Sequence, residues 1–504
     1  FYVSGAFHGN KSLLRVNIFS GVEETYQAWY GVTQDSLATN RTFNPYTYEN
    51  EVDHYQQDHY QLIFSQELSS KWNLNVNGHY TRGRGYFEQF REDDDLADYN
   101  LDDVMVGGDT ITSSDFVRRR WLDNHFYGFT FGLNYSNMRQ FSATIGGGWN
   151  QYLGDHYGEV IWSEYASNSE IRHRYYDNSA KKNDMNLYGK VNYFVHPKLS
   201  LFADIQFRRI DYTYEGPFQK EDSTLRTSQQ TVRWMFFNPK AGINYEINSK
   251  NRVYASFAVA NREPARKDLV ESSQVSRPLH ETLYDTEVGY QRATRRYQFG
   301  ANLYWMNYKN QLVLSGRIND VGAYINQNVD MSDRYGVEFY WGWNIVKNLQ
   351  WSANFTYSQN KIKNFVEYYD DYDNGGQVEI EHGTTDISFS PDFIAGSELV
   401  YEPVKNLKFA LITKYVGEQF LDNTSSTNRK LNDYLLNNIR IGYSFNWKFF
   451  KEIQIGLLMN NIFDQKYESN GYTYSFLAGG ETTTANFYYP QAGFNVMSNL
   501  TVKF

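Results

Sequence analysis

The sequence predicts an all-β protein, a transmembrane antiparallel β-barrel, and three observations carry that prediction. Apolar and polar residues alternate, connections alternate between short and long, and aromatic residues gather towards the ends of the expected strands. The 504 residues include 44 Tyr, 35 Phe and 11 Trp, so that 18% are aromatic. Mean hydropathy is −0.65, and no stretch approaches the roughly 20 apolar residues of a membrane-spanning helix. These figures exclude a helical membrane protein.

Alternation with a period of two is the first observation. In the segment 199–208 apolar residues occupy the odd positions and polar residues the even ones, apart from Phe202. The segments 72–80, 351–358 and 494–504 alternate in the same way, and this is the pattern of a strand with one apolar face. We expect Leu201, Ala203, Ile205 and Phe207 to face lipid, and Asp204, Gln206 and Arg208 to face the barrel interior or a plug.

The connections and the aromatic residues favour a membrane barrel over a soluble sandwich, which would also alternate. Short connections fall at 9–10, 69–70, 196–197, 248–250 and 346–347, and long polar ones at 23–56, 84–118, 153–183, 262–279 and 361–385. Transmembrane barrels have short turns on one side and long loops on the other, with aromatic girdles at both interfaces. The expected strands, of about 10–14 residues, are longer than the usual strands of soluble proteins.

Counting from turn to loop gives about 19 strands. Their expected centres are 4, 16, 62, 76, 130, 145, 189, 204, 240, 256, 286, 300, 338, 354, 394, 411, 438, 456 and 498. The first and the last strand both run towards the short-turn side, although bacterial barrels normally have an even number of strands. We therefore expect residues 1–504 to be one barrel domain, the C-terminal part of a presumed 22-stranded barrel. The N-terminal plug and the first strands would be missing, so residues 1–7 should not close onto residues 494–504.

Six motifs, taken in order along the chain, resemble the TonB-dependent outer-membrane receptors. They are residues 19–32 (FSGVEETYQAWYGV), 261–268 (NREPARKD), 283–290 (LYDTEVGY), 390–391 (SP), 415–417 (YVG) and 460–467 (NNIFDQKY), followed by the alternating C-terminus that ends on Phe504. The resemblance implies active import of a scarce, large solute across the bacterial outer membrane, with a ferric siderophore as the leading ligand. Haem, cobalamin and oligosaccharide are the alternatives by the same mechanism. The implied partners are TonB with its inner-membrane motor, outer-membrane lipid and lipopolysaccharide, and a surface lipoprotein.

Candidate ligand contacts lie in two segments expected at the outer rim. They are Trp29, Tyr30, Arg118, Arg119, Arg120 and Trp121. Arginine binds anionic groups through forked hydrogen bonds, and exposed aromatic rings can stack on flat chelating groups. The alternatives are that the arginines hold lipopolysaccharide phosphates, or that they pair with the acidic run at 92–95.

Other classes of function find little support in the sequence. The chain has no Cys, which excludes thiolate zinc sites and thiol catalysis, and its net charge of −10 argues against nucleic acid. No catalytic motif is present, so we expect no enzyme activity and no cofactor. The weak metal candidates, His54 with His59 and the acidic segment 367–376, are interpreted as a solvated loop and a solvated turn. A passive porin, normally of 16–18 strands without a plug, is the rival transport class.

Overall fold

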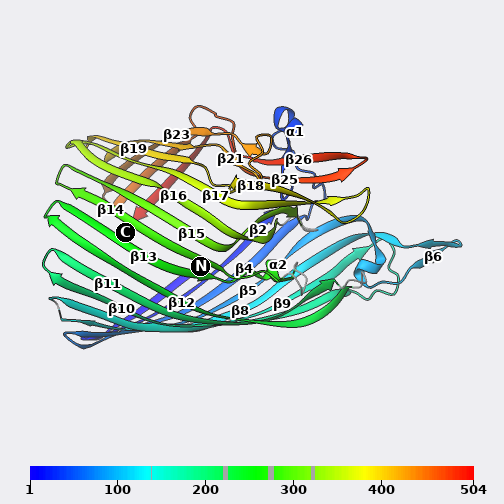
Figure 1. The fold of residues 1–504 in the computed structure, drawn as a ribbon, viewed down its shortest axis with the longest axis horizontal. Coiled ribbons are helices and arrows are strands. Elements are labelled where there is room, and N and C mark those ends of the chain that lie inside the picture. Colours follow the sequence, from blue (N-terminus) through cyan, green and yellow to red (C-terminus); the bar gives the residue numbers. More distant parts are fainter. Residues whose placement is uncertain (138, 220–224, 271–276, 319–323) are drawn as a thin grey trace.

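A computed structural model describes residues 1–137, 139–219, 225–270, 277–318 and 324–504. The residues at 271–276, within the connection expected at 262–279, lie outside this description. One large, tilted antiparallel sheet curls around an interior (Figure 1), and it contains 23 of the described strands. No helix in these ranges is long and apolar enough to cross a membrane.

Within the described ranges, four of the 23 strands (β3, β18, β25 and β26) lie beyond the wall, and the other 19 follow one another around it. Each of the 19 expected centres falls inside one of these wall strands. The wall strands are β1 (Tyr2–His8), β2 (Ser12–Tyr26), β4 (Val52–Ser69), β5 (Trp72–Asp95), β8 (Ser113–Ser136), β9 (Phe141–Ser163), β10 (Arg174–His196), β11 (Leu199–Gln219), β12 (Leu225–Asn248), β13 (Asn251–Arg262), β14 (Glu281–Ala293), β15 (Tyr297–Ile318), β16 (Tyr324–Val346), β17 (Leu349–Asp371), β19 (Phe393–Val404), β20 (Leu407–Val416), β23 (Tyr434–Trp447), β24 (Phe450–Asn460) and β27 (Asn495–Lys503).

The remaining elements decorate the end of the wall that carries the long connections, on the right in Figure 1. They are β3 (Val32–Thr33), α1 (Gln34–Thr39), the 3-10 helix η1 (Leu96–Tyr99), β6 (Val104–Val106), β7 (Asp109–Ile111), α2 (Arg266–Val270), β18 (Gln377–Asp386), β21 (Gln419–Phe420), β22 (Lys430–Leu431), β25 (Glu468–Ala478) and β26 (Glu481–Pro490). The β6–β7 hairpin projects furthest from the wall, and we call this decorated end the outer rim.

Several strands are much longer than the predicted 10–14 residues, and this corrects the expected loops. β5 and β8 each have 24 residues, and β9 and β10 each have 23. Most of the connections expected at 84–118 and 153–183 are therefore paired strand. Near the outer rim these long strands carry polar residues on both faces, so the alternation of apolar and polar residues is lost in the sequence. The backbone pairing between the strands nevertheless continues there.

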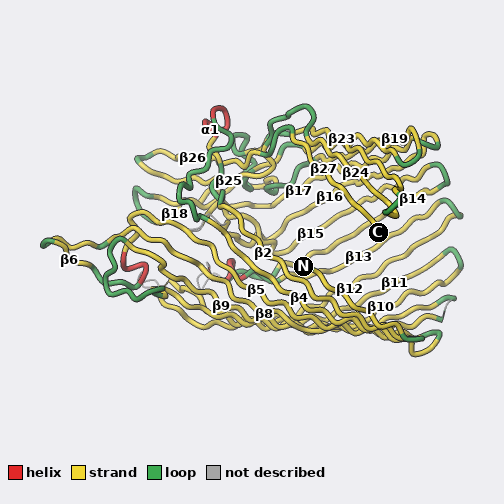
Figure 2. The backbone as a smooth tube through the Cα atoms, turned by 180° about the vertical axis from the view of Figure 1, so that it is seen from behind, coloured by secondary structure: helices red, strands yellow, loops and turns green. Residues whose placement is uncertain are grey.

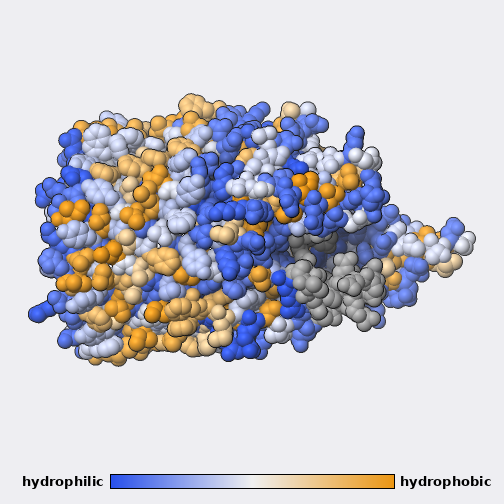
Figure 3. Space-filling view, viewed as in Figure 1, coloured by the Kyte–Doolittle hydropathy of each residue, from blue (hydrophilic) through white to orange (hydrophobic). Residues whose placement is uncertain are grey.

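The wall has an apolar outer face and a polar inner face. On β11, Leu201, Ile205 and Phe207 are exposed on one face, whereas Arg208 on the other face pairs with Asp184 and Glu263 at 2.6 and 3.1 Å. This agrees with the facing expected from alternation. On the side shown in Figure 3, apolar residues gather over the half with short turns, and hydrophilic residues gather over the outer rim. This distribution is expected for a barrel whose short-turn half is embedded in lipid.

The terminal strands do not pair with each other. Among the described residues, β1 pairs only with β2, and β27 pairs only with β24, and both chain ends are marked in Figure 2. At the outer rim, however, the connection after β2 meets the connection before β27. Val32 and Thr33 pair with Tyr488 and Phe487, and the Tyr489 hydroxyl donates to the Trp29 carbonyl at 2.5 Å.

The segment 460–467 owes its shape to Asn461. This residue adopts a left-handed conformation with φ of 48°, which asparagine tolerates better than most residues. Its side-chain oxygen accepts from the Gln465 N–H, and its amide donates to the Gln465 carbonyl, both at 2.9 Å. The Asn461 N–H in turn donates to Asn438 on β23 at 2.8 Å. The motif therefore ends β24 and turns the chain into the connection that precedes β27.

Candidate functional site

The arginine run 118–120 is divided between the two faces of the wall. All three residues lie in β8, where neighbouring side chains point to opposite sides. Arg118 and Arg120 pair in register with Gln89 and Phe87, which lie on the inner face of β5. Arg119 and Trp121 pair with Glu88 and Tyr86 on the outer face. A ligand inside the barrel could therefore reach only half of the residues that the sequence predicted as one set.

The inner half of the predicted set assembles around Phe87. The Arg120 guanidinium lies over the rings of Phe87 and Tyr176 at 5.5 and 5.6 Å. Trp29 meets the same Phe87 ring edge-on, with ring centroids 4.9 Å apart. The structure therefore brings Trp29 and Arg120, 91 residues apart, onto one aromatic ring. Tyr30 instead contacts Tyr46, at 5.3 Å.

Two polar atoms in this region are buried without a partner among the described residues. They are Arg118 Nε and the Tyr175 hydroxyl. Arg118 donates to Gln89 Oε1 at 3.1 Å through another nitrogen. Burial raises the pKa of Tyr175 to about 12, so its phenol stays neutral and able to donate at physiological pH. Buried donors of this kind favour a ligand that brings acceptor oxygens.

An aromatic patch, defined here as Tyr152, His156, Tyr212, Tyr214 and Arg266, continues the inner surface towards α2. The rings of Tyr212 and Tyr214 stack at 5.1 Å, and Arg266 Nε is buried without a partner in the described part of the chain. The upper part of β9 carries His156 beyond the expected membrane band, where burial and the nearby Arg266 and Arg120 lower its pKa to about 4.

The sequence prediction missed this patch. Its residues come from β9, β11 and the segment after β13, and no short motif joins them. Only Arg266 fell within a motif noted above, in the segment 261–268, where the family resemblance gave it no ligand role.

The two residues of the predicted set that lie on the outer face, Arg119 and Trp121, already have partners on the wall itself. Arg119 pairs with Glu88 at 2.6 Å and covers the Tyr86 ring at 4.1 Å. Trp121 donates to Glu159 at 2.9 Å. The acidic run at 92–95 was the expected partner of the arginines, yet its Asp94 pairs with Arg91 at 3.0 Å. The ion-pair interpretation therefore fits Arg119, with Glu88 in place of the acidic run.

The weak metal candidates do not come together. His54 and His59 both lie in β4, not in the predicted loop, and five residues of strand place them on opposite faces. His54 contacts Glu24 and His59 contacts Thr81, each at 3.0 Å. The segment 367–376 forms the end of β17 and a hairpin turn. Among the residues described, no group of three or more possible ligands gathers around one point.

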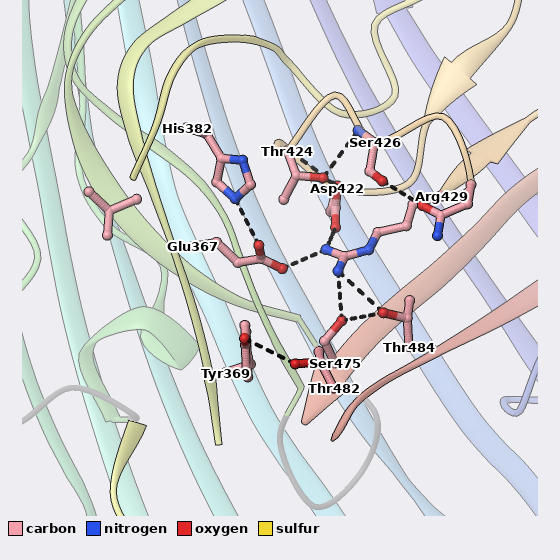
Figure 4. Close-up of polar contacts among 12 residues, drawn as sticks. Glu367, Tyr369, His382, Asp422, Thr424, Ser426, Arg429, Ser475, Thr482 and Thr484 are labelled. Carbon is pink, nitrogen blue, oxygen red and sulfur yellow. Dashed lines mark hydrogen bonds and ion pairs between the residues drawn. The ribbon is translucent and has the colours of Figure 1, made fainter. Parts of the chain in front are cut away.

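A buried ionic cluster at the outer rim centres on Arg429 (Figure 4). Its guanidinium pairs with Glu367 on β17 at 2.5 Å and with Asp422 at 2.8 Å. It also donates to Ser475 on β25 and Thr484 on β26, at 2.9 and 3.3 Å. Two carboxylates and two hydroxyl groups of the protein itself occupy the terminal nitrogens of the guanidinium, although its Nε is buried without a partner among the described residues. Because its charge is already balanced by Glu367 and Asp422, the arrangement suits a structural joint between rim segments better than a site for an anionic ligand.

A second ionic network, on the inner face, involves the motif at 261–268. Glu263 accepts from Lys182 at 2.7 Å and pairs with Arg208 at 3.1 Å, and Arg208 also holds Asp184. Asp268 accepts from the Ala265 N–H at 2.8 Å and from Asn326 at 3.0 Å. This part of the motif therefore ties β10, β11 and β16 to the chain that follows β13.

Comparison with known proteins agrees with this architecture. The family model described as "TonB dependent receptor-like, beta-barrel" matches residues 6–462. A comparison with curated protein sequences finds no match to the chain.

Similar solved structures include the ferric-catecholate import receptor Fiu from K12 E. coli in its closed form, at 12% identity and a TM-score of 0.67, over 99% of this chain and 73% of that one. The copper transporter OprC matches at 13% identity and a TM-score of 0.73, over 99% of this chain and 71% of that one. The ferric citrate transporter FecA in its unliganded form matches at 14% identity and a TM-score of 0.73, over 100% of this chain and 69% of that one. At these identities the likeness concerns the fold alone.

The family match covers most of the 504 residues, and it coincides with a 19-stranded wall that has an apolar outer face, short turns at one end and long ribbons at the other. The resemblance of the motifs is thereby confirmed at the level of the family. The chain belongs to the TonB-dependent receptor β-barrel family.

Proposed function

We propose that this chain is the barrel of a TonB-dependent importer in the bacterial outer membrane, and that its cargo is a ferric siderophore. One observation carries the choice of cargo: Arg118, Arg120 and Arg266 lie on the inner face among tyrosine, phenylalanine and tryptophan rings. Forked guanidinium donors suit an anionic oxygen chelate, and the rings suit its flat chelating groups. TonB and its motor would act through a plug that lies outside residues 1–504.

Several observations support an anionic cargo over the alternatives. Arg118 and Arg266 each have a buried nitrogen without a partner among the described residues. Such donors favour a ligand with acceptor oxygens, and an anionic chelate has several. Cobalamin lacks net negative charge, so the arginines would contribute little to its binding. A passive porin is disfavoured by the family match, because the matched family consists of TonB-dependent receptors.

The decisive experiment uses the alternation within the arginine run. The variant carrying Arg118→Gln and Arg120→Gln removes two inner-face charges, whereas Arg119→Gln removes an adjacent charge on the outer face. Binding of ferric siderophores, haem and cobalamin to receptor purified from outer membranes would be followed by quenching of tryptophan fluorescence. The double variant should weaken binding of the anionic siderophore roughly 10–100-fold, since each charge-assisted hydrogen bond contributes about 1.5–3 kcal/mol before losses.

The control variant Arg119→Gln should bind within about twofold of wild type, because Arg119 lies on the outer face and its guanidinium pairs with Glu88 of the wall itself. Siderophore affinity should also fall as salt rises, and the double variant should lose much of that dependence. Equal affinities in the double variant and the control would exclude the inner arginines as ligand contacts. Tight binding of cobalamin alone would overturn the choice of cargo.

A further inference from the structure

The outer face of β10, β11 and β12 changes from apolar to charged within a few residues. Four rows of paired residues, each two residues further from the short turns, show the change: Leu187, Phe207 and Phe237; then Met185, Arg209 and Met235; then Asn183, Asp211 and Arg233; then Lys181, Thr213 and Thr231. The rings of Phe207 and Phe237 contact each other at 5.0 Å. The first charged residue, Arg209, therefore lies in the row next to this aromatic pair, on the side towards the outer rim.

The height of this boundary corresponds to the outer interface of the membrane. Arg209 lies ten residues beyond Leu199, where β11 begins at the short-turn end. At about 3.3 Å per residue and a tilt of about 40°, that distance is about 25 Å along the barrel axis. The apolar band of an outer-membrane barrel is also about 25 Å tall, with aromatic girdles at its edges. The charged rows therefore lie at the level of the lipid headgroups.

One carboxylate at this level holds two guanidinium groups. Arg209 Nε donates to Asp211 Oδ2 at 2.7 Å, and its Nη2 donates to Oδ1 at 3.2 Å. Arg233 Nε donates to the same Oδ1. Two positive charges therefore share one negative charge. Lys181 lies in the next row, and Glu215, which accepts from the Ser179 N–H, lies in the row after that. The Arg209 and Arg233 side chains remain 44% and 60% exposed, so several of their donors are open to an acceptor outside the protein.

The arrangement differs from a second arginine pair on the same face. Arg82 and Arg84 also share one carboxylate, that of Asp123. There, however, Asp58 lies directly across from Arg82, and Asp155 lies directly across from Asp123. These two further carboxylates offset the positive charge. The cluster of Arg209, Asp211 and Arg233 differs from that pair in having a surplus of positive charge. Its donors are also exposed, and it lies at the level of the lipid headgroups.

We propose that Arg209 and Arg233, preorganised by Asp211, bind a phosphomonoester of a glycolipid in the outer leaflet, the chemistry of the lipid A part of lipopolysaccharide. A phosphomonoester carries about −1.5 to −2 charges at neutral pH, more than the single charge of a phosphodiester headgroup. Two guanidinium forks match its oxygens. The acyl chains of the same lipid would lie against Phe207, Phe237 and Met235, the last of which is 78% exposed.

Lipid binding to receptor purified in a mild detergent tests the proposal. Native mass spectrometry would count bound lipid A, phosphatidylglycerol and phosphatidylethanolamine over a titration of each. Wild type should prefer lipid A, and the variant with Arg209→Gln and Arg233→Gln should bind it roughly tenfold more weakly, as expected for a loss of about 1.4 kcal/mol. A variant with Arg209→Lys and Arg233→Lys keeps the charge without the forks and should fall between the two.

The matched control is Lys363→Gln, which removes a positive charge of the outer face that pairs one-to-one with Asp333 at 3.0 Å. It should leave lipid A binding unchanged, and heat-dependent gel mobility would show that all variants are folded. Unchanged lipid A binding in the Arg→Gln variant would overturn the proposal. So would an equal loss in the Lys363 control, or a wild type that binds phosphatidylglycerol as tightly as lipid A.

Discussion

Single residues in this barrel take their chemistry from the face and the depth at which the strand places them. His156 is an example, since burial and two neighbouring arginines hold its pKa at about 4, below the ordinary value of about 6.5. It is therefore neutral at physiological pH, and the charge of the aromatic patch comes from Arg266, with Arg120 nearby. The same reasoning separates Arg118 from Arg119, which are neighbours in sequence but lie on opposite faces of β8.

The depressed pKa of His156 predicts a dependence of stability on pH. Between about 6.5 and about 4 the unfolded chain binds a proton that the folded protein does not, so stability present above pH 6.5 is lost as pH falls through this window. The loss should amount to roughly 1–3 kcal/mol, discounted for the partial exposure of the ring. Urea unfolding in lipid vesicles at pH 7 and pH 4.5 would measure it. The variant His156→Gln should lose less stability on acidification than wild type, and an identical loss in both would remove His156 as the cause.

At the scale of elements, the outer rim is joined through contacts between hairpins. The tip of the β17–β18 hairpin meets the tip of the β25–β26 hairpin, where the Asp373 carboxylate accepts from the Gly479 and Gly480 N–H groups, both at 2.7 Å. β17 and β25 pair in parallel at Asp370 and Phe476. The Arg429 cluster fixes the same two hairpins closer to the wall. Two separate joints therefore hold one hairpin against the other.

Removing the joint at the tip should loosen the β25–β26 hairpin without affecting the wall. Asp373→Ala removes two hydrogen bonds at an exposed tip, where water can replace the lost acceptor, so the cost should be about 0.5–1.5 kcal/mol. Hydrogen exchange at residues 476–482 should accelerate accordingly, while exchange in β23 and β24 stays as in wild type. Asn374→Ala is the control, because within the described part of the chain its side chain donates only to Asp371 of the same turn. Equal exchange in both variants would show that the tip contact carries no weight.

At the scale of the whole molecule, the wall is a sheet whose two faces meet different solvents, and facing predicts which substitutions it tolerates. Ala203→Arg on the outer face of β11 should cost about 2–4 kcal/mol near the middle of the membrane. Gln206→Arg on the inner face should cost much less, because that surface is already polar. Unfolding in lipid vesicles would compare the two, and equal costs would reject the assignment of faces.

The sequence was sufficient to predict the fold class, all 19 wall strands and the facing of β11, because period-two alternation records the difference between lipid and the polar interior. It was insufficient for the upper ribbons of β5, β8, β9 and β10, where both faces are polar and strands look like loops. It also could not show the Arg429 cluster, whose partners Glu367 and Thr484 are 62 and 55 residues away. The predicted ligand set is divided because Arg118, Arg119 and Arg120 lie in the paired strand β8, whereas the sequence predicts a loop there, in which alternation does not apply.

The contact of Val32 and Thr33 with Tyr488 and Phe487 has a mechanical consequence. It joins the connection that follows β2 to the β25–β26 hairpin, which precedes β27 in the chain. A displacement of one segment is therefore transmitted to the other at the outer rim through the pairing of β3 with β26, and does not have to travel around the wall. The position of the β25–β26 hairpin is thus coupled to that of the connection after β2, although the two segments come from opposite ends of the chain.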